Sequence, residues 1–212
     1  METWAVVVAG GTGTRFGAAK QFADLGGRPL IAWSLAAARQ ACRGVVLVLP
    51  AGSPPDPWDA DAVVAGGSTR SQSVRSGLAA VPETADVIAV HDAARPLARL
   101  ALWEAVLEAV AAGADGAIPA APVTDTVKEI GPDGHLVTLD RSRLVAVQTP
   151  QAFRASVLRR AHLAAGDATD DAALVEAAGG RVVLVAGPAD NVKVTSPLDL
   201  VVAAALASVS PP

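Results

Sequence analysis

Cysteine, aromatic residues, lysine and net positive charge are all scarce in this 212-residue sequence. The single cysteine, Cys42, excludes an intrachain disulfide framework and a cysteine-rich metal site, and we expect it to be structural. The net charge of −4 provides no general basic field for nucleic acid. No apolar run reaches the roughly 18–20 residues that a membrane span needs, and no charged-then-apolar leader precedes the first apolar run. We therefore expect a cytoplasmic protein that binds neither nucleic acid nor membranes.

Several familiar catalytic and nucleotide-binding motifs are also absent. The sequence contains no G-x-S-x-G and no H-E-x-x-H, so the common hydrolase templates lack support. The glycine-rich stretch at residues 10–17 lacks the G-K-[ST] of a Walker A loop, and its glycines are spaced one residue too far apart for the dinucleotide fingerprint. The next predicted strand ends at Leu49-Pro50 without an acid for a ribose diol, which counts further against NAD.

The stretch from Ala5 to Ile31 instead joins a short apolar strand to a glycine-rich loop with two cations. Glycines allow sharp turns and a close ligand, and clustered backbone N–H groups beside fixed positive charges suit a polyphosphate. A tight structural turn is the alternative interpretation. The glycines are Gly10, Gly11, Gly13 and Gly17, and the cations are Arg15 and Lys20.

Short apolar runs alternate with helical patterns along most of the chain. We expect strands near residues 4–9, 45–49, 62–65, 86–90, 115–119 and 181–185, and helices near residues 29–42, 74–80, 99–112, 154–164, from 169 onward, and 196–207. Nearly all-apolar strands between helices are typical of an α/β, Rossmann-like fold, in which a mostly parallel sheet carries helices on both faces. We expect one domain, residues 1–212.

Polar residues follow several of these strands. Because ligands bind beyond the carboxyl ends of parallel strands, the loops after the first, third and fourth strands should open on one rim. Asp92 there suggests a Mg²⁺ ligand beside phosphates, and Asp190, which also follows a strand, is a second candidate. Lys20 and Lys193 are compact point charges suited to phosphate oxygens. The alternative interpretation of Asp92 is an aspartate in a turn or helix cap, and that of the two lysines is a solvated position on the surface.

The three histidines have less support as catalytic groups. His91 could act as a general base, but a phosphate nucleophile is already anionic, so we favour a structural role. We expect His135 and His162 to be solvated. Thr169 is predicted to be the N-cap of the helix that follows it, and Trp58 to be a surface plug rather than a platform for a base.

The alternation breaks between residues 122 and 147. Apolar residues there flank Gly131-Pro132-Asp133-Gly134, which indicates a β-hairpin with a polar turn. Because the hairpin falls between α/β units, it should project as an arm of about residues 122–143. Exposed apolar strand edges need cover, which a partner subunit would provide. A hairpin folded back over its own site is the alternative.

Taken together, these loops resemble the 2-C-methyl-D-erythritol 4-phosphate cytidylyltransferases of the non-mevalonate isoprenoid pathway. The matching motifs are AGGTGTRF with Lys20-Gln21, GGSTRSQSV, VHDAARP, APVTDTVK, TLDR, TPQAF, ATDDA and ADNVKVT. Ribitol-5-phosphate cytidylyltransferases share the fold and several motifs, but HDAARP looks more like the methylerythritol enzymes. The chain departs from the family pattern at Ala19, where proline is usual, and at Ser68, where an acid is common.

The resemblance implies direct transfer of CMP from CTP to an acceptor phosphate, with Mg²⁺ and a homodimer of interlocked arms. The implied catalytic residues are Arg15, Lys20, Arg141 and Lys193. The implied CTP-binding residues are Ala9, Gly10, Gly11, Gly13, Gly67, Arg70, Ser73, Ala93 and Arg95. The implied acceptor-binding residues are Thr126 and Arg141 on the arm, which reach the site of the partner subunit, with Thr169, Asp190 and Lys193. The implied metal ligand is Asp92, and Asp190 stays the second candidate from its place after a strand.

Overall fold

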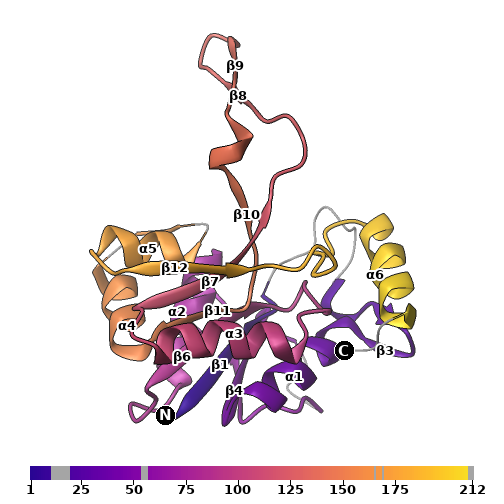
Figure 1. The fold of residues 1–212 in the computed structure, drawn as a ribbon. Coiled ribbons are helices and arrows are strands. Elements are labelled where there is room, and N and C mark those ends of the chain that lie inside the picture. Colours follow the sequence, from indigo (N-terminus) through magenta and orange to yellow (C-terminus); the bar gives the residue numbers. More distant parts are fainter. Residues whose placement is uncertain (11–19, 54–56, 165, 169, 210–212) are drawn as a thin grey trace.

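An eight-stranded sheet organises the protein (Figure 1). The computed structural model describes residues 1–10, 20–53, 57–164, 166–168 and 170–209. The strands of this sheet are β1 (Thr3–Val8), β4 (Gly44–Leu49), β5 (Ala62–Ala65), β6 (Val87–Asp92), β7 (Gly116–Pro122), β10 (Val145–Val147), β11 (Gln151–Arg154) and β12 (Val182–Ala186). The helices are α1 (Leu30–Ala41), α2 (Arg70–Ala80), α3 (Leu100–Ala111), α4 (Ala155–Ala164), α5 (Asp171–Ala177) and α6 (Pro197–Val209).

The sheet is mostly parallel, as the sequence predicts. β1 pairs in parallel with β4 and β6, β4 with β5, and β7 with β12. The exceptions are β10 and β11, which run antiparallel to their neighbours β7 and β6. These two antiparallel strands were not expected as part of the sheet. β10 pairs with the carboxyl-terminal part of β7 and β11 with its start, and β11 also joins β7 to β6.

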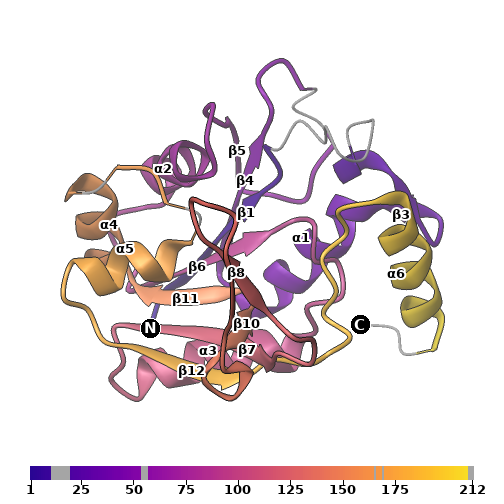
Figure 2. The ribbon, with the colours of Figure 1, turned by 90° about the horizontal axis from the view of Figure 1, so that it is seen from above.

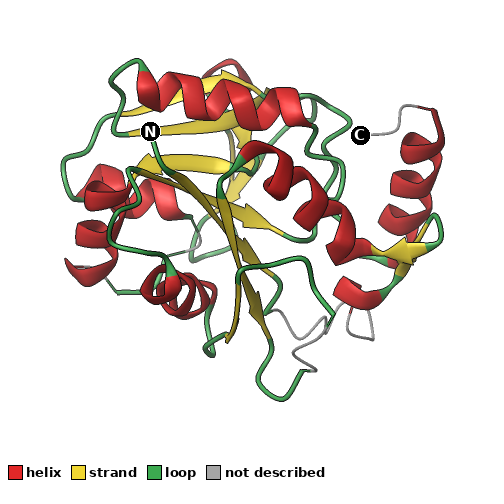
Figure 3. Cartoon of the chain, turned by 90° about the horizontal axis from the view of Figure 1, so that it is seen from below, coloured by secondary structure: helices red, strands yellow, loops and turns green. Residues whose placement is uncertain are grey.

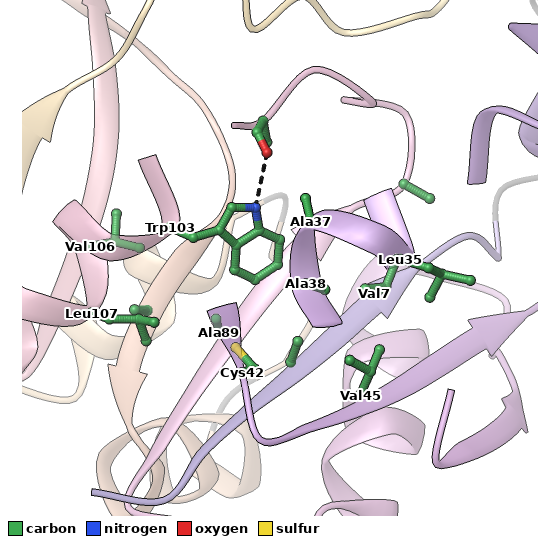
Figure 4. Close-up of a cluster of buried hydrophobic side chains, with 14 of the residues drawn as sticks. Val7, Leu35, Ala37, Ala38, Cys42, Val45, Ala89, Trp103, Val106 and Leu107 are labelled. Atoms are coloured by element: carbon green, nitrogen blue, oxygen red, sulfur yellow. Dashed lines mark hydrogen bonds between the residues drawn. The ribbon is translucent and has the colours of Figure 1, made fainter. Parts of the chain in front are cut away.

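Helices cover both faces of the sheet (Figures 2 and 3). Successive strand residues point to opposite faces, so Val7 belongs to the core beneath α1 and α3, whereas Val6 belongs to the core beneath α2, α4 and α5. Trp103 of α3 is fully buried in the first core, and its indole N–H donates to the carbonyl of Ala98 at 3.2 Å (Figure 4). Cys42 lies in the same core, as its predicted structural role requires.

The predicted hairpin extends away from the body of the protein (Figure 1). Its strands β8 (Lys128–Ile130) and β9 (Leu136–Thr138) pair only with each other among the described residues. Ile130, Leu136 and Val137 on it are exposed by 72%, 53% and 46%. The hairpin therefore does not fold back over its own site, and its apolar side chains have no cover within the described part of the chain.

A short hairpin outside the main sheet, formed by β2 (Asp24–Leu25) and β3 (Arg28–Pro29), packs against α6 through β2. This short hairpin was not predicted. Its Leu25 is fully buried beside Leu30 and Ala203. None of the helices that the structure describes is long and apolar enough to cross a membrane.

Candidate functional site

The loops after β1, β5 and β6 open into one cleft of about 450 Å³ at the carboxyl ends of these strands. The prediction that these loops share a rim is therefore confirmed. The cleft also receives the 3-10 helix η1 (Lys20–Phe22) and the loop before α6. Predicted site residues that line it are Ala9, Gly10, Lys20, Gly67, Arg70, Ser73, Asp92, Ala93 and Lys193.

Asp92, the last residue of β6, is the carboxylate of this cleft, and its side chain is 13% exposed. One of its oxygens accepts a hydrogen bond from Arg70 Nε at 3.1 Å, and the other accepts from Lys193 Nζ at 2.6 Å. Burial alone would raise the pKa of Asp92, but the positive charges of Arg70 and Lys193 outweigh it and hold this pKa well below its usual range. Asp92 is therefore ionised at neutral pH.

Arg70 reaches the cleft from the first turn of α2, which begins earlier than the sequence predicted. Thr69 is the N-cap, and its hydroxyl accepts from the backbone N–H of Gln72 at 3.1 Å, so Arg70 and Ser73 are helical rather than part of the preceding loop. Burial lowers the pKa of Arg70, but the carboxylates of Asp171 and Asp92 more than compensate and raise it. The guanidinium thus stays charged beside Asp92.

Ser73, one turn further along α2, bonds the loop after β5 and lies close to the loop after β1. Its hydroxyl donates to the carbonyl of Thr69 at 3.0 Å and accepts from the N–H of Gly67 at 3.2 Å. A Cβ added at Gly66 would lie 2.8 Å from Ser73 Oγ, and one added at Gly10 would lie 3.1 Å from it. Glycine is therefore required where the loop after β5 crosses α2.

Lys20 connects the first loop of the cleft to the last one. Its Nζ donates to the carbonyl of Val194 at 2.9 Å, and the N–H of Val194 donates to the carbonyl of Ala94 at 2.8 Å. These bonds place Lys20 and Lys193 on the same cleft although they are far apart in sequence. The side chain of Lys193 is 42% exposed and lines the cleft, so a ligand there would have access to it.

His91 lies beneath Asp92 and is fully buried. Its Nε2–H donates to the carbonyl of Arg95 at 3.1 Å, so its Nδ1 accepts from the hydroxyl of Thr149, also at 3.1 Å. The same hydroxyl accepts from the backbone N–H of Asp92 at 3.0 Å. Burial lowers the pKa of His91 to about 4, so the ring is neutral. With both nitrogens occupied by the protein, His91 is structural, as predicted.

A second cavity of about 250 Å³ adjoins the cleft and shares Arg70, Asp92 and Lys193 with it. The predicted residue Arg95 lines it, with a pKa lowered by burial, and donates to the carbonyl of Asn191 at 2.6 Å. The polar residues of this cavity that were not singled out from sequence are Gln148, Thr149, Gln151 and Asp170. They fall in or beside the TPQAF and ATDDA motifs, and these motifs were the sequence feature from which they could have been found.

Other predicted site residues lie outside both cavities. Asp190 forms an ion pair with Arg99 at 2.7 Å and lines neither cavity. Thr126 and Arg141 are exposed on the arm, where Arg141 donates to the carbonyl of Thr124. Gly11, Gly13, Arg15 and Thr169 lie outside the described residues.

Two minor predictions are wrong. His162, expected to be solvated, is 3% exposed and bonds Asp171 through Nε2 at 3.0 Å. The N-cap of α5 is Asp170 rather than Thr169, and the side chain of Asp170 makes no capping hydrogen bond. His135 is exposed, as expected. Trp58 is half-buried and stacks on Phe22 with ring centroids 5.7 Å apart, in agreement with a plug.

The cleft suits a metal that arrives with a phosphate ligand better than a metal held by protein alone. No group of three or more histidine, cysteine, aspartate or glutamate side chains that could hold a metal occurs among the described residues. Mg²⁺ typically takes one or two carboxylates and completes its shell with water and substrate phosphates. Asp92 can supply one such carboxylate, so the residues present fit a Mg²⁺–polyphosphate complex.

Comparisons with known proteins agree with this chemistry. A family model described as 2-C-methyl-D-erythritol 4-phosphate cytidylyltransferase matches residues 3–208. A protein of that name from Rubrobacter xylanophilus is 45% identical over 216 residues, which cover 95% of this chain and 93% of the relative. One from Streptomyces coelicolor is 43% identical over 228 residues, covering 97% of this chain and 84% of the relative. The crystal structure of the enzyme from Thermus thermophilus superposes with a TM-score of 0.85 at 40% identity, covering 98% of this chain and 100% of that one. This chain therefore belongs to the 2-C-methyl-D-erythritol 4-phosphate cytidylyltransferase family.

Proposed function

We propose that this protein transfers CMP from CTP to 2-C-methyl-D-erythritol 4-phosphate, giving 4-diphosphocytidyl-2-C-methyl-D-erythritol and pyrophosphate in isoprenoid biosynthesis. The observation that carries the proposal is the pair of adjoining cavities with Arg70, Asp92 and Lys193 at their junction. A transfer between two phosphates needs two binding sites with positive charge where they meet. Family membership supports the identity of both substrates.

We assign CTP to the larger cleft and the acceptor to the smaller cavity. For CTP, the residues are the backbone of Ala9, Gly10, Gly11 and Gly13 with Gly67, Arg70, Ser73 and Ala93, together with Arg95, which lines the adjoining smaller cavity. For the acceptor, they are Lys193, Thr169 and Asp190, with Thr126 and Arg141 contributed from the arm of a second copy. Arg15, Lys20, Arg141 and Lys193 are the proposed catalytic cations. The contacts of Asp190 with Arg99 give it less support than the others.

The reaction needs orientation and charge stabilisation rather than a general base. The acceptor phosphate is anionic and attacks the α-phosphorus of CTP in line, and pyrophosphate leaves, so no proton must be removed from the nucleophile. This agrees with a neutral His91 whose nitrogens are both bonded. Bound Mg²⁺ would neutralise charge on the phosphates. Lys193 would then move from Asp92 to a phosphate oxygen, since Asp92 can serve the cation instead.

Pyrophosphate release with CTP and Mg²⁺ tests the proposal, with methylerythritol phosphate and ribitol 5-phosphate supplied separately. We expect turnover with the first acceptor. Lys193→Ala should lower kcat by about 10²- to 10³-fold, the usual effect of removing one stabilising donor. Arg43→Ala is the matched control, because Arg43 is largely exposed at the opposite end of β1 and β4. Turnover with ribitol 5-phosphate alone would contradict the acceptor, and undiminished kcat in Lys193→Ala would contradict the site.

We also propose that the protein is a cytoplasmic homodimer joined through its arms. The support is the exposed apolar surface of β8 and β9, together with Val145, which is 46% exposed at the base of the arm. Deletion of the tip, about residues 130–135, should weaken dimerisation in analytical ultracentrifugation and lower activity. A deletion variant that remains dimeric and fully active would show that the tip is dispensable.

A further inference from the structure

A buried chain of charged and polar groups leads from the site into the body of the protein. Arg70, whose Nε bonds Asp92, also donates from Nη1 to one oxygen of Asp171 at 2.8 Å. The other oxygen of Asp171 accepts from His162 Nε2 at 3.0 Å. The side chains of Asp171 and His162 are only 1% and 2% exposed. Neither residue lines either cavity, and neither belongs to the substrate sites assigned above.

This chain fixes the guanidinium of Arg70 from behind. A buried carboxylate is costly unless each oxygen has a partner, and Asp171 meets that need with Arg70 on one oxygen and His162 on the other. His162 lies on α4 among Leu158 and Ala161, which belong to the packed core of that face. Arginine presents its donors in a planar, rigid fork, so holding Nη1 at Asp171 also sets the direction in which Nε meets Asp92.

The backbone around Arg70 is held by a second set of bonds to the segment before α5. The hydroxyl of Ser71 donates to the carbonyl of Ala168 at 2.8 Å and accepts from its N–H at 3.0 Å. The hydroxyl of Thr69 donates to Asp167 at 2.8 Å. The first turn of α2 and the approach to α5 are therefore bonded together, so a change at Asp171 reaches the site through the Arg70 side chain rather than by freeing the helix.

We propose that Asp171 and His162 are positioning residues for nucleotidyl transfer, which hold Arg70 so that it fixes Asp92 at the junction of the two cavities. The inference rests on the proposed function and adds to it two residues remote from both substrates. Arg70 would then do more than contact the nucleotide, because its orientation depends on α4 and α5 as well as on its own helix.

A double-mutant cycle between Arg70 and Asp171 tests the inference. Arg70→Met and Asp171→Asn should each lower kcat by about 10- to 100-fold, as misplacement of a reacting group by about 1 Å can do. In the Arg70→Met background, Asp171→Asn should cause no further loss, because its effect passes through the missing guanidinium. Glu83→Gln is the control, since Glu83 is largely exposed and the change removes only its ion pair with Arg159 of α4, which should leave kcat unchanged.

His162 provides a second, milder test. His162→Gln keeps an N–H donor near the position of Nε2 and should retain most of kcat, whereas His162→Phe removes the donor and should resemble Asp171→Asn. If Asp171→Asn does not fold by circular dichroism, the two His162 variants carry the same cycle with Arg70→Met. The inference would be overturned if Asp171→Asn lowered kcat equally in the wild-type and Arg70→Met backgrounds, or if Asp171→Asn or His162→Phe kept the wild-type kcat. Either result would leave the proposed function intact. A wild-type protein inactive with every acceptor would overturn the proposed function as well.

Discussion

Thr149 is the residue whose removal should reveal most clearly how the site is supported. It is only 5% exposed, and its hydroxyl accepts from the N–H of Asp92 and donates to Nδ1 of His91. Valine has nearly the same shape but lacks the hydroxyl. Thr149→Val would therefore leave one buried donor and one buried acceptor without a partner, with little change in packing.

The size of the effect follows from these two groups. Each buried polar group left unsatisfied costs about 1–3 kcal/mol, so the free energy of unfolding should fall by about 2–6 kcal/mol. For a domain of this size each kcal/mol shifts Tm by about 2–4 °C, which predicts a decrease on the order of 10 °C. Activity should fall too, because the backbone of Asp92 loses its anchor beside the cleft.

Urea unfolding followed by circular dichroism measures this change directly. Thr138→Val is the matched control, because Thr138 is exposed on the arm and its hydroxyl accepts only from Lys128 Nζ among the described contacts. Surface changes of this kind usually stay within about 0.5 kcal/mol. If Thr149→Val is as stable as Thr138→Val, the reasoning that Thr149 satisfies two buried groups is refuted.

Three further predictions concern pH, loop packing and the metal. Folding lowers the pKa of His91 to about 4 from an ordinary value of about 6.5, so between these pH values only the unfolded chain binds the proton. The contribution of His91 to the free energy of unfolding is therefore fully present above pH 6.5 and falls by about 3 kcal/mol as the pH drops to 4. The urea midpoint of His91→Gln should change less with pH than that of the wild type, and an equal change would contradict this. Gly67→Ala puts a Cβ 2.3 Å from that of Gln72 and should raise KM for CTP, whereas Gly166→Ala, with open space around it, should not; equal KM values would exclude the clash. Asp92→Asn should raise the Mg²⁺ concentration for half-maximal activity more than Asp190→Asn does, and the reverse order would favour Asp190 as the ligand.

The parallel part of the sheet could be predicted because its strands consist almost wholly of apolar residues, and two of them, β4 and β6, are buried along their whole length. β11 could not, since its four residues, Gln-Ala-Phe-Arg, carry no such run. It becomes a strand through pairing with β6 and β7, which are distant in sequence. Strand preference depends strongly on such neighbours.

Helix signals in the sequence account for two other differences between the predicted and the observed structure. Thr69 followed three residues later by Gln72 is a capping-box pattern, which marks the true start of α2 at Arg70. In α4, Leu158 and His162 are four residues apart and so share a face, which indicates that His162 is buried. By contrast, no local pattern could pair Asp190 with Arg99, because that contact depends on how two loops meet.

The charges of the site show why a protein with a net charge of −4 can bind a triphosphate. Lys20, Arg70 and Lys193 all line the larger cleft, where the carboxyl group of Asp92 opposes them. Arg70 is tied to buried Asp171, but Lys193 is half-exposed and bound to Asp92 alone among its described partners. If Asp92 were to hold a divalent cation, Lys193 would lose its described partner, whereas Arg70 would keep Asp171. Of these two side chains, Arg70 is therefore the one that the protein holds in place, and Lys193 is the one that could turn toward a phosphate.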